Sequence, residues 1–364
     1  MNENRYQITE RTGDFGFAGS KAPADVSTIA EKLDFVPVSI VMRTTEKSRL
    51  AKVQRQIGFA IDWSRAIRSI QAPSLLLLQF PFHYPQLTRE TALQTIRRKN
   101  GLSVIGLVHD VEELRGYRYS DYYRREFAFM LDYADVLIVH NDRMKQFFLE
   151  RGVSKDRLVV LQIFDYLLDP ASITAQNKKE ITFERSLNIA GNLSARKSGY
   201  LRELTELPDI TLHLYGAGPD KSMQDKKNVV YHGMFAPEKL PDVISSGFGL
   251  VWDGETIQGC SGAAGNYLRY NNPHKLSLYL ASGIPVVIWK EAAEAAFVEQ
   301  NHLGITVNSV QEATERILAM TPDQYVFFAE QVQKVAAKLR EGDYTRQALE
   351  EAIAICRSQA TALR

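Results

Sequence analysis

Cysteine is nearly absent from this chain of 364 residues, which contains only Cys260 and Cys356. Two cysteines are too few for a disulfide framework or a cysteine zinc site, so a reducing compartment fits best. Long apolar runs are also lacking, because stretches such as Leu75–Leu78 stop far short of the ~18 residues that span a bilayer. Residues 1–15 are polar and charged and lack the apolar centre of a signal peptide. We therefore expect a cytoplasmic protein, with contact at the inner face of a membrane left open.

An excess of charge of either sign is missing as well. The chain has 44 Lys and Arg residues against 43 Asp and Glu residues, a net charge of +1. This balance argues against a generally cationic nucleic-acid-binding protein and leaves room only for a local basic groove. Hydrophobic residues make up 45% and charged residues 24%, which excludes general disorder and a fibrous repeat. The length suggests about two domains, each large enough to bury a core.

Apolar segments of strand length alternate with amphipathic segments of helix length along most of the chain. The expected strands are 36–42, 74–80, 103–109, 136–140 and 158–163, followed by 186–190, 211–215, 229–231, 248–252 and 286–289. The expected helices are 50–70, 89–99, 121–133, 144–151, 198–205, 237–245, 274–281, 291–301 and 310–320. This order predicts an α/β fold with right-handed crossovers and mostly parallel sheets.

A polar stretch that contains Pro170 separates two such α/β units. We predict an N-terminal domain over residues 1–165, a linker over 166–185 and a second domain over 186–321. Residues 322–364 form a long amphipathic tail, whose helices we expect to pack back toward the N-terminal domain.

A glycine and two cations follow the first strand of the second half, where open parallel sheets bind ligands. Gly191 lets the backbone turn close to a ligand, and Asn192, Arg196 and Lys197 come after it. The two cations suit a diphosphate, although a solvated loop is the alternative. Tyr215 ends the next strand, before a glycine-containing turn. The chain has neither G-x-G-x-x-G nor G-x-x-x-x-G-K-[ST], so dinucleotide-binding and P-loop interpretations lose their main support.

The segment Asn271–Val287 carries the clearest signal of an anion site. Pro273 suits a first helical turn, and the free N–H groups at that helix start would attract a phosphate. Lys275 adds a full charge, and Gly283 ends the helix before the next strand. A helix that is merely well capped is the alternative.

His109 and Asp110 follow the third strand of the first half. A carboxylate at a strand end that faces a cleft could take a proton from an acceptor hydroxyl. His109 could do the same or could orient Asp110. The alternative is an aspartate that caps the following turn.

Three further segments are candidates for ligand contacts. Gly19, Ser20 and Lys21 precede a helical segment and could contact a ligand, and a mobile terminus is the competing interpretation. The small-residue loop 255–270 is a lid or a disordered loop. Residues 117–125 mix aromatics with cations, which could stack on bases or sugars or form a subunit contact, and we favour either a sugar or a subunit contact over nucleic acid.

The pattern P-x-K-L…Y-L-A-S-G-I-P-V-V within Asn271–Val287 resembles the donor-binding segment of GT-B glycosyltransferases. More narrowly, residues 18–25, 109–115 and 247–252 resemble bacterial galactofuranosyltransferases and the related glucosyltransferases that extend adhesin glycans. The resemblance runs from about residue 16 to residue 337, and the order and spacing of the motifs carry it. It implies two Rossmann-like domains with a cleft between them, the second holding a nucleotide sugar and the first presenting the acceptor.

The resemblance also implies an activity and the roles of residues. The donor would be a UDP-hexose, UDP-galactofuranose first, and the acceptor a saccharide hydroxyl on a surface glycan, free or lipid-linked. Asp110 would be the base of an inverting displacement, and Tyr215 would lie near the uracil. The loop with Gly19, Ser20 and Lys21 would border the cleft on the side of the sugar or the acceptor. The residues that would hold the diphosphate and the ribose are Asn271, Asn272, His274, Lys275, Leu276 and Ser277. Arg196, Lys197 and Lys275 would stabilise the departing UDP without a metal or another cofactor.

One position departs from the pattern, because many GT-B enzymes carry a glutamate that binds the ribose where this chain has Leu278. The ribose contacts must then come from elsewhere, and a non-catalytic sugar-binding or scaffold subunit stays open. A UDP-glucose-dependent glucosyltransferase, an epimerase and a phosphorylase are further alternatives. The sequence does not determine whether the chain forms a homo-oligomer.

Overall fold

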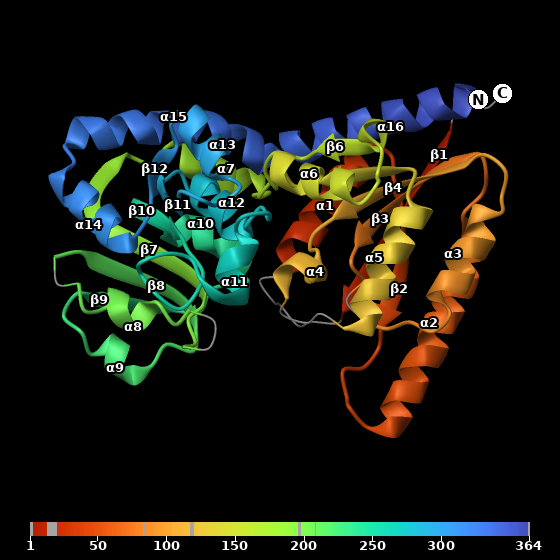
Figure 1. Cartoon of the computed structure of the whole chain (residues 1–364), viewed down its shortest axis with the longest axis horizontal. Coiled ribbons are helices and arrows are strands. Elements are labelled where there is room, and N and C mark those ends of the chain that lie inside the picture. Colours follow the sequence, from red (N-terminus) through yellow and green to blue (C-terminus); the bar gives the residue numbers. More distant parts are fainter. Residues whose placement is uncertain are drawn as a thin grey trace.

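Two separate six-stranded parallel sheets form the framework of the molecule (Figure 1). The computed structural model describes residues 3–12, 20–82, 84–116, 120–195, 198–207 and 209–362. The first sheet has the order β2-β1-β3-β4-β5-β6 and the second the order β12-β11-β10-β7-β8-β9. Each sheet carries helices on its faces, so the chain has the two-domain α/β architecture of the GT-B fold. None of the helices in these residue ranges is both long and apolar enough to span a bilayer.

The strands of the first sheet are β1 (Asn4–Thr12), β2 (Val36–Met42), β3 (Ser74–Phe80), β4 (Leu102–Val108), β5 (Val136–Val139) and β6 (Leu158–Val160). The strands of the second sheet are β7 (Thr182–Asn192), β8 (Thr211–Ala217), β9 (Val229–Gly233), β10 (Ser246–Val251), β11 (Val286–Trp289) and β12 (Gly304–Val307). All neighbouring strands run parallel, so the carboxyl ends of each sheet lie along one edge.

The helices before the crossing between the sheets are α1 (Lys21–Lys32), α2 (Arg49–Ser69), α3 (Arg89–Arg97), α4 (Glu112–Arg115), α5 (Asp121–Tyr133) and α6 (Asp142–Glu150). Those that follow are α7 (Pro170–Asn177), α8 (Leu201–Leu204), α9 (Lys221–Gln224), α10 (Leu240–Val243), α11 (Gly262–Tyr267), α12 (His274–Ala281), α13 (Ala295–Gln300), α14 (Val310–Ala319), α15 (Pro322–Glu341) and α16 (Asp343–Ala362). Short 3₁₀ turns cover Lys155–Arg157 and Pro237–Lys239.

The sequence pattern missed β1, which lies centrally between β2 and β3. Its residues are mostly polar, yet the side chain of Gln7 is completely buried. The Gln7 amide nitrogen donates to the carbonyl oxygens of Ser27 and Phe35. A polar side chain whose donor is satisfied by the backbone can occupy a core position, so a central strand need not be an apolar run.

The predicted linker 166–185 is not an extended connection, because it contains α7 and the start of β7. Asp169 caps α7 by accepting a hydrogen bond from the Ser172 backbone nitrogen at 2.9 Å. Helix α1 and strand β12 were also not predicted, and the helix expected over 198–205 shrinks to the single turn of α8.

The last two helices cover different sheets. Helix α15 packs into the core of the second sheet through residues such as Tyr325 and Val332. Helix α16 packs on the first sheet, where Leu349 and Ile353 join the core formed with α1, β3 and β4. Figure 1 shows both helices along the upper edge of the molecule, with the two chain ends close together. The chain therefore crosses between the two sheets twice, before α7 and at the α15–α16 junction.

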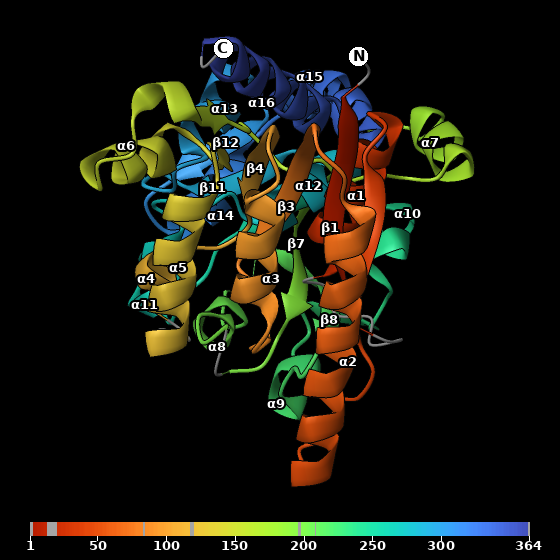
Figure 2. The same cartoon turned by 90° about the vertical axis from the view of Figure 1, so that its right-hand side faces the viewer.

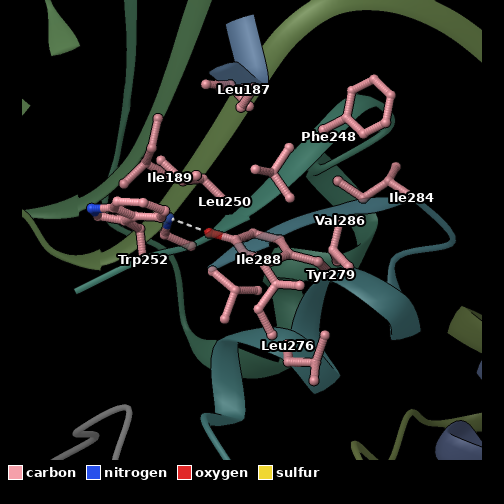
Figure 3. Packing of buried hydrophobic residues seen from close by; sticks show 14 of the residues in the cluster. Leu187, Ile189, Phe248, Leu250, Trp252, Leu276, Tyr279, Ile284, Val286 and Ile288 are labelled. Atoms are coloured by element: carbon pink, nitrogen blue, oxygen red, sulfur yellow. Dashed lines mark hydrogen bonds between the residues drawn. The ribbon is translucent and has the colours of Figure 1, made fainter. Parts of the chain in front are cut away.

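Helix α12 is locked onto the second sheet by one aromatic side chain (Figure 3). The Tyr279 hydroxyl accepts a hydrogen bond from the Ala190 backbone nitrogen at 2.8 Å. The Tyr279 ring lies directly over Gly249, where a Cβ atom would come within 2.1 Å of it. Glycine in β10 thus allows the helix to approach, and the start of α12 has a fixed position relative to the ends of β7 and β10.

Candidate functional site

The carboxyl ends of β4, β5 and β6 face the segment that leads into α12. The Asn272 backbone nitrogen donates to His140 Nδ1 at 3.0 Å, and the Asn272 side-chain nitrogen donates to the Gln162 carbonyl oxygen at 3.0 Å. The Val111 backbone nitrogen donates to the Tyr267 hydroxyl at 2.9 Å. The start of α12 therefore lies against the edge of the first sheet where ligands of parallel sheets bind.

His140 is a central residue of this junction and was missed by sequence reasoning. Its Nε2 lies 3.0 Å from the Val108 carbonyl oxygen, and its Nδ1 accepts from Asn272. Burial lowers the pKa of His140 to about 4, so the ring is neutral at pH 7, with its proton on Nε2. The available signal was its position at the carboxyl end of the predicted strand 136–140.

Asn141 makes a second contact between the two halves. Its side-chain nitrogen donates to the Tyr270 carbonyl oxygen at 3.0 Å and to Glu294 Oε1 at 2.8 Å. Burial raises the pKa of Glu294 to about 8, which the hydrogen bond from Asn141 only partly offsets. A protonated Glu294 thus serves as a neutral buried acceptor that holds the Tyr270–Asn272 segment against β5.

Asp110 lies at the edge of this junction. Its carboxylate accepts from Arg115 Nη1 at 2.9 Å, and its side chain is 27% exposed. Tyr267 has a raised pKa because of burial first, then the charge of Asp110, and a hydrogen bond to that carboxylate adds to the effect. Helix α4 is preceded by Val111, not by Asp110, and has no side-chain cap. The capping role considered for Asp110 is therefore not what the structure shows.

His109 stands beside Asp110 but is turned toward the first sheet. Its Nε2 lies 2.6 Å from Gln79 Oε1, and its ring stacks on Phe164 with centroids 5.2 Å apart. These contacts fix the ring at the end of β4. The geometry suits a positioning role better than that of a proton acceptor.

Lys275 lies at the first turn of α12, as the sequence predicts, and its ammonium group already has partners within the chain. Its Nζ donates to Asp253 Oδ1 and to the Trp252 carbonyl oxygen, both at 2.8 Å. The two side chains keep exposed fractions of 21% and 16%. An anion at this point would share the Lys275 ammonium with Asp253. Pro273 is the residue before the helix rather than part of its first turn.

The other residues predicted on this segment are mostly buried. The His274 ring stacks on Tyr166 at 5.0 Å, and Leu276 and Ser277 are fully enclosed. The Leu276 side chain belongs to the core and cannot contact a ligand. Within the described ranges, Asn271 Oδ1, Asn272 Oδ1 and Ser277 Oγ are buried without a hydrogen-bond partner. Unpaired buried polar atoms are rare, and three of them gather around the start of this helix.

Two glycines stand side by side where β7 and β8 end. Gly191 pairs with Gly216, and both have positive φ angles, of 126° and 146°. A Cβ on Gly191 would meet nothing within 4 Å, whereas one on Gly216 would lie 1.8 Å from the Gly191 carbonyl oxygen. The Asn192 side chain accepts from the Ser194 backbone nitrogen. Gly191 is thus an open backbone position, while Arg196 and Lys197 lie outside the described residues.

Two of the predicted side chains are buried and have partners within the chain. Tyr215 is only 4% exposed, and its ring stacks on His232 with centroids 4.5 Å apart. Lys21 is 5% exposed, and its Nζ donates to both Asp25 oxygens and to the Leu167 carbonyl oxygen. With these three contacts, Lys21 links α1 to the crossing segment. Ser20 lies exposed before α1, and Gly19 falls outside the described residues.

The loop 255–270 is partly helical, since it contains α11. Tyr267 at the end of α11 is 4% exposed and bonded to Val111 across the junction. The loop was expected to be either a lid or disordered, and the part that forms α11 is ordered.

A separate surface groove has a volume of about 520 Å³ and is lined by residues of β12, α14 and α15 and by Met320 between the two helices. It contains none of the predicted site residues.

Comparison with protein families matches both halves of the chain. Residues 5–163 match the model of the glucosyltransferase 3-like N-terminal domain, and residues 187–352 match that of the C-terminal domain. The β-1,6-galactofuranosyltransferase WbbI of Escherichia coli K12 is 32% identical over 343 residues, which cover 93% of this chain and 94% of that protein. Glucosyltransferase 3 of Streptococcus gordonii is 26% identical over 69% of this chain and 70% of its own.

A solved structure supports the fold alone. An α-glucosyltransferase in complex with UDP superimposes with a TM-score of 0.57 at 14% identity, covering 97% of this chain and 99% of that one. The same two-domain architecture is therefore present in a protein of very different sequence.

Proposed function

This chain belongs to the glucosyltransferase 3-like family of GT-B glycosyltransferases, and on that premise we propose that it transfers a galactofuranosyl group from UDP-galactofuranose to a saccharide hydroxyl during surface glycan synthesis. WbbI, the relative that supports this donor, is named a galactofuranosyltransferase. The observation that carries the proposal is the position of Asp110, which the Val111–Tyr267 hydrogen bond holds against the segment leading into α12.

We place the donor diphosphate at the amino end of α12. The helix dipole and the free N–H groups of its first turn favour an anion there. The Lys275 ammonium group, which donates to Asp253, would also donate to the diphosphate. The open Gly191 backbone would let the ligand approach β7. By family resemblance, Arg196 and Lys197 would contribute positive charge to the diphosphate.

Asp110 then acts as the base. The acceptor oxygen attacks the anomeric carbon, its proton passes to Asp110, and the bond from that carbon to UDP breaks with inversion. The charge that develops on the diphosphate is stabilised by Lys275 and the start of α12. Because these groups supply the positive charge, we propose that no metal is needed, and EDTA should leave the rate unchanged.

A glucosyl donor is the second candidate, because a relative and the family itself carry the glucosyltransferase name. The first experiment is a thermal-shift series with UDP, GDP, ADP and CMP, since a ligand that binds only the folded state raises its stability. The second compares UDP-galactofuranose with UDP-glucose in a transfer assay with saccharide acceptors.

Of the four nucleotides, we expect only UDP to stabilise the protein. We also expect turnover of UDP-galactofuranose that depends on the acceptor. If the enzyme prefers UDP-glucose, the proposed donor is wrong but the proposed transfer reaction stands. Turnover without an acceptor would indicate an epimerase, release of sugar phosphate with inorganic phosphate a phosphorylase, and no product from the purified chain a non-catalytic subunit.

A further inference from the structure

Helix α2 carries an apolar stripe that no described part of the chain covers. Leu50, Val53, Ile57 and Ile61 have exposed fractions of 68%, 57%, 56% and 45%. Their spacing of three or four residues places them on one helix face. The opposite face is buried against the first sheet through residues such as Phe59 and Trp63. The exposed apolar face is therefore additional to the one that holds the helix in place.

Leu87 extends this stripe from the loop before α3. It is 80% exposed, and its backbone nitrogen donates to Gln56 Oε1 on α2 at 3.0 Å. Gln56 in turn donates to the Pro85 carbonyl oxygen at 2.9 Å. These two bonds fix the loop beside the helix, so Leu87 is held at the edge of the apolar face. We call Leu50, Val53, Ile57, Ile61 and Leu87 the α2 patch.

Positive charges lie near the α2 patch. Arg49, Arg65 and Arg68 are exposed cations four or seven residues from Val53 or Ile61, and Lys52 is a further exposed cation on another side of the helix. The single carboxylate of α2, Asp62, has a side chain only 4% exposed and is paired with Arg43 and Arg65. The exposed surface of α2 therefore combines apolar and cationic side chains without a carboxylate, and Glu46 precedes the helix.

The placement of α2 makes the patch accessible to a flat surface. In both views the amino-terminal part of the helix extends past the rest of the first sheet, at the lower edge of the molecule (Figures 1 and 2). Leu50, Val53 and Ile57 lie on this part. A projecting helix can meet a plane without rearrangement of the fold.

We propose that the α2 patch binds the surface of an anionic lipid bilayer. An interfacial helix inserts its apolar face at the level of the headgroups, while flanking cations attract anionic lipids. A second copy of the chain fits less well, because pairing two α2 helices would set cations against cations with no exposed α2 carboxylate to compensate them. The proposal concerns binding alone and does not depend on the proposed donor or acceptor.

The test is flotation of the full-length chain with vesicles of phosphatidylcholine alone or of phosphatidylcholine mixed with phosphatidylglycerol. We expect binding to the anionic vesicles only, weakened by added salt. The double variant V53Q/I57Q should bind about tenfold more weakly, since two apolar side chains no longer leave water. R49Q/K52Q should lose about fivefold for each cation removed.

Matched controls come from the second half of the chain. Met234 is exposed and apolar, and Lys221 and Lys227 are exposed cations outside α2. M234Q and K221Q/K227Q should bind like the unchanged chain. All these side chains are on the surface, so thermal midpoints should stay close to that of the unchanged chain, and transfer to a soluble acceptor should be unaffected.

Three results would overturn the proposal. The first is no flotation with anionic vesicles at low salt, and the second is equal losses in the α2 and control variants. The third is a dimer in light scattering that V53Q/I57Q converts to a monomer while vesicle binding is absent, which would assign the α2 patch to a second copy. Failure of sugar transfer with intact vesicle binding would instead concern the proposed function.

Discussion

The Tyr267 hydroxyl accepts a hydrogen bond from the backbone nitrogen of Val111 at 2.9 Å. This bond connects α11 of the second half to the residue that follows Asp110 in the first. Burial raises the pKa of Tyr267, and the nearby charge of the Asp110 carboxylate raises it further. One phenol thus sets the position of the proposed base relative to the segment that leads into α12.

Replacing Tyr267 with phenylalanine should lower both stability and transfer. The change leaves the buried Val111 N–H without its acceptor, which costs about 1–3 kcal/mol. We expect a lower thermal midpoint and a kcat reduced at least about tenfold. Tyr325→Phe is the matched control, because it removes a single buried bond, to the Gly247 carbonyl oxygen at the amino end of β10, away from the junction. Equal kcat losses in the two variants would show that Tyr267 does not position the site.

Asp110→Asn should remove the proton acceptor while keeping the side-chain shape. Loss of a general base reduces kcat by about 10²–10⁴-fold, and steady-state transfer assays across pH measure it. Glu113→Gln is the control. Glu113 lies on α4, three residues after Asp110, but it pairs with Arg151 at the end of α6, outside the junction. A kcat within about twofold of the unchanged enzyme would assign the base to another residue.

Lys275→Gln should weaken donor binding and leave the fold intact. Loss of a charge-assisted contact to the diphosphate should raise the KM for the UDP-sugar about tenfold or more. The stabilisation by UDP in a thermal shift should shrink in parallel. Lys290→Gln, at an exposed cation on the same half, should change neither quantity. An unaltered UDP shift in Lys275→Gln would place the diphosphate elsewhere.

Glu294→Gln should change how stability depends on pH. The folded-state pKa of Glu294 is raised from 4.5 to about 8, so its contribution is complete below pH 4.5 and is lost as the pH rises toward 8. A glutamine can still accept the bond from Asn141 but cannot ionise. The variant should therefore match the unchanged protein near pH 5 and exceed it near pH 8, by an amount on the order of 3 kcal/mol.

Urea unfolding at both pH values measures this difference. Glu341→Gln, an exposed carboxylate at the end of α15, should show no such dependence. A stability difference that is the same at pH 5 and pH 8 would mean that Glu294 is ionised in the folded protein.

The sequence by itself determined the parallel α/β architecture. Strands such as β3 and β4 are apolar because helices bury both faces of a parallel sheet, so their positions could be predicted from the chain alone. The segment that leads into α12 was recognisable too, because helix starts and stops depend on nearby residues. The helix itself was found over the predicted residues 274–281.

Only the tertiary structure decided which polar side chains face the junction. Gln7, Lys21 and Tyr215 are polar or amphipathic residues that the fold buries, and each has at least one partner in another segment of the chain: Ser27, Leu167 and His232 respectively. His140 and Asn272 are 132 residues apart and meet because two sheet edges come together. Local patterns determine an element, but the burial and pairing of a polar group depend on what the rest of the chain packs against it.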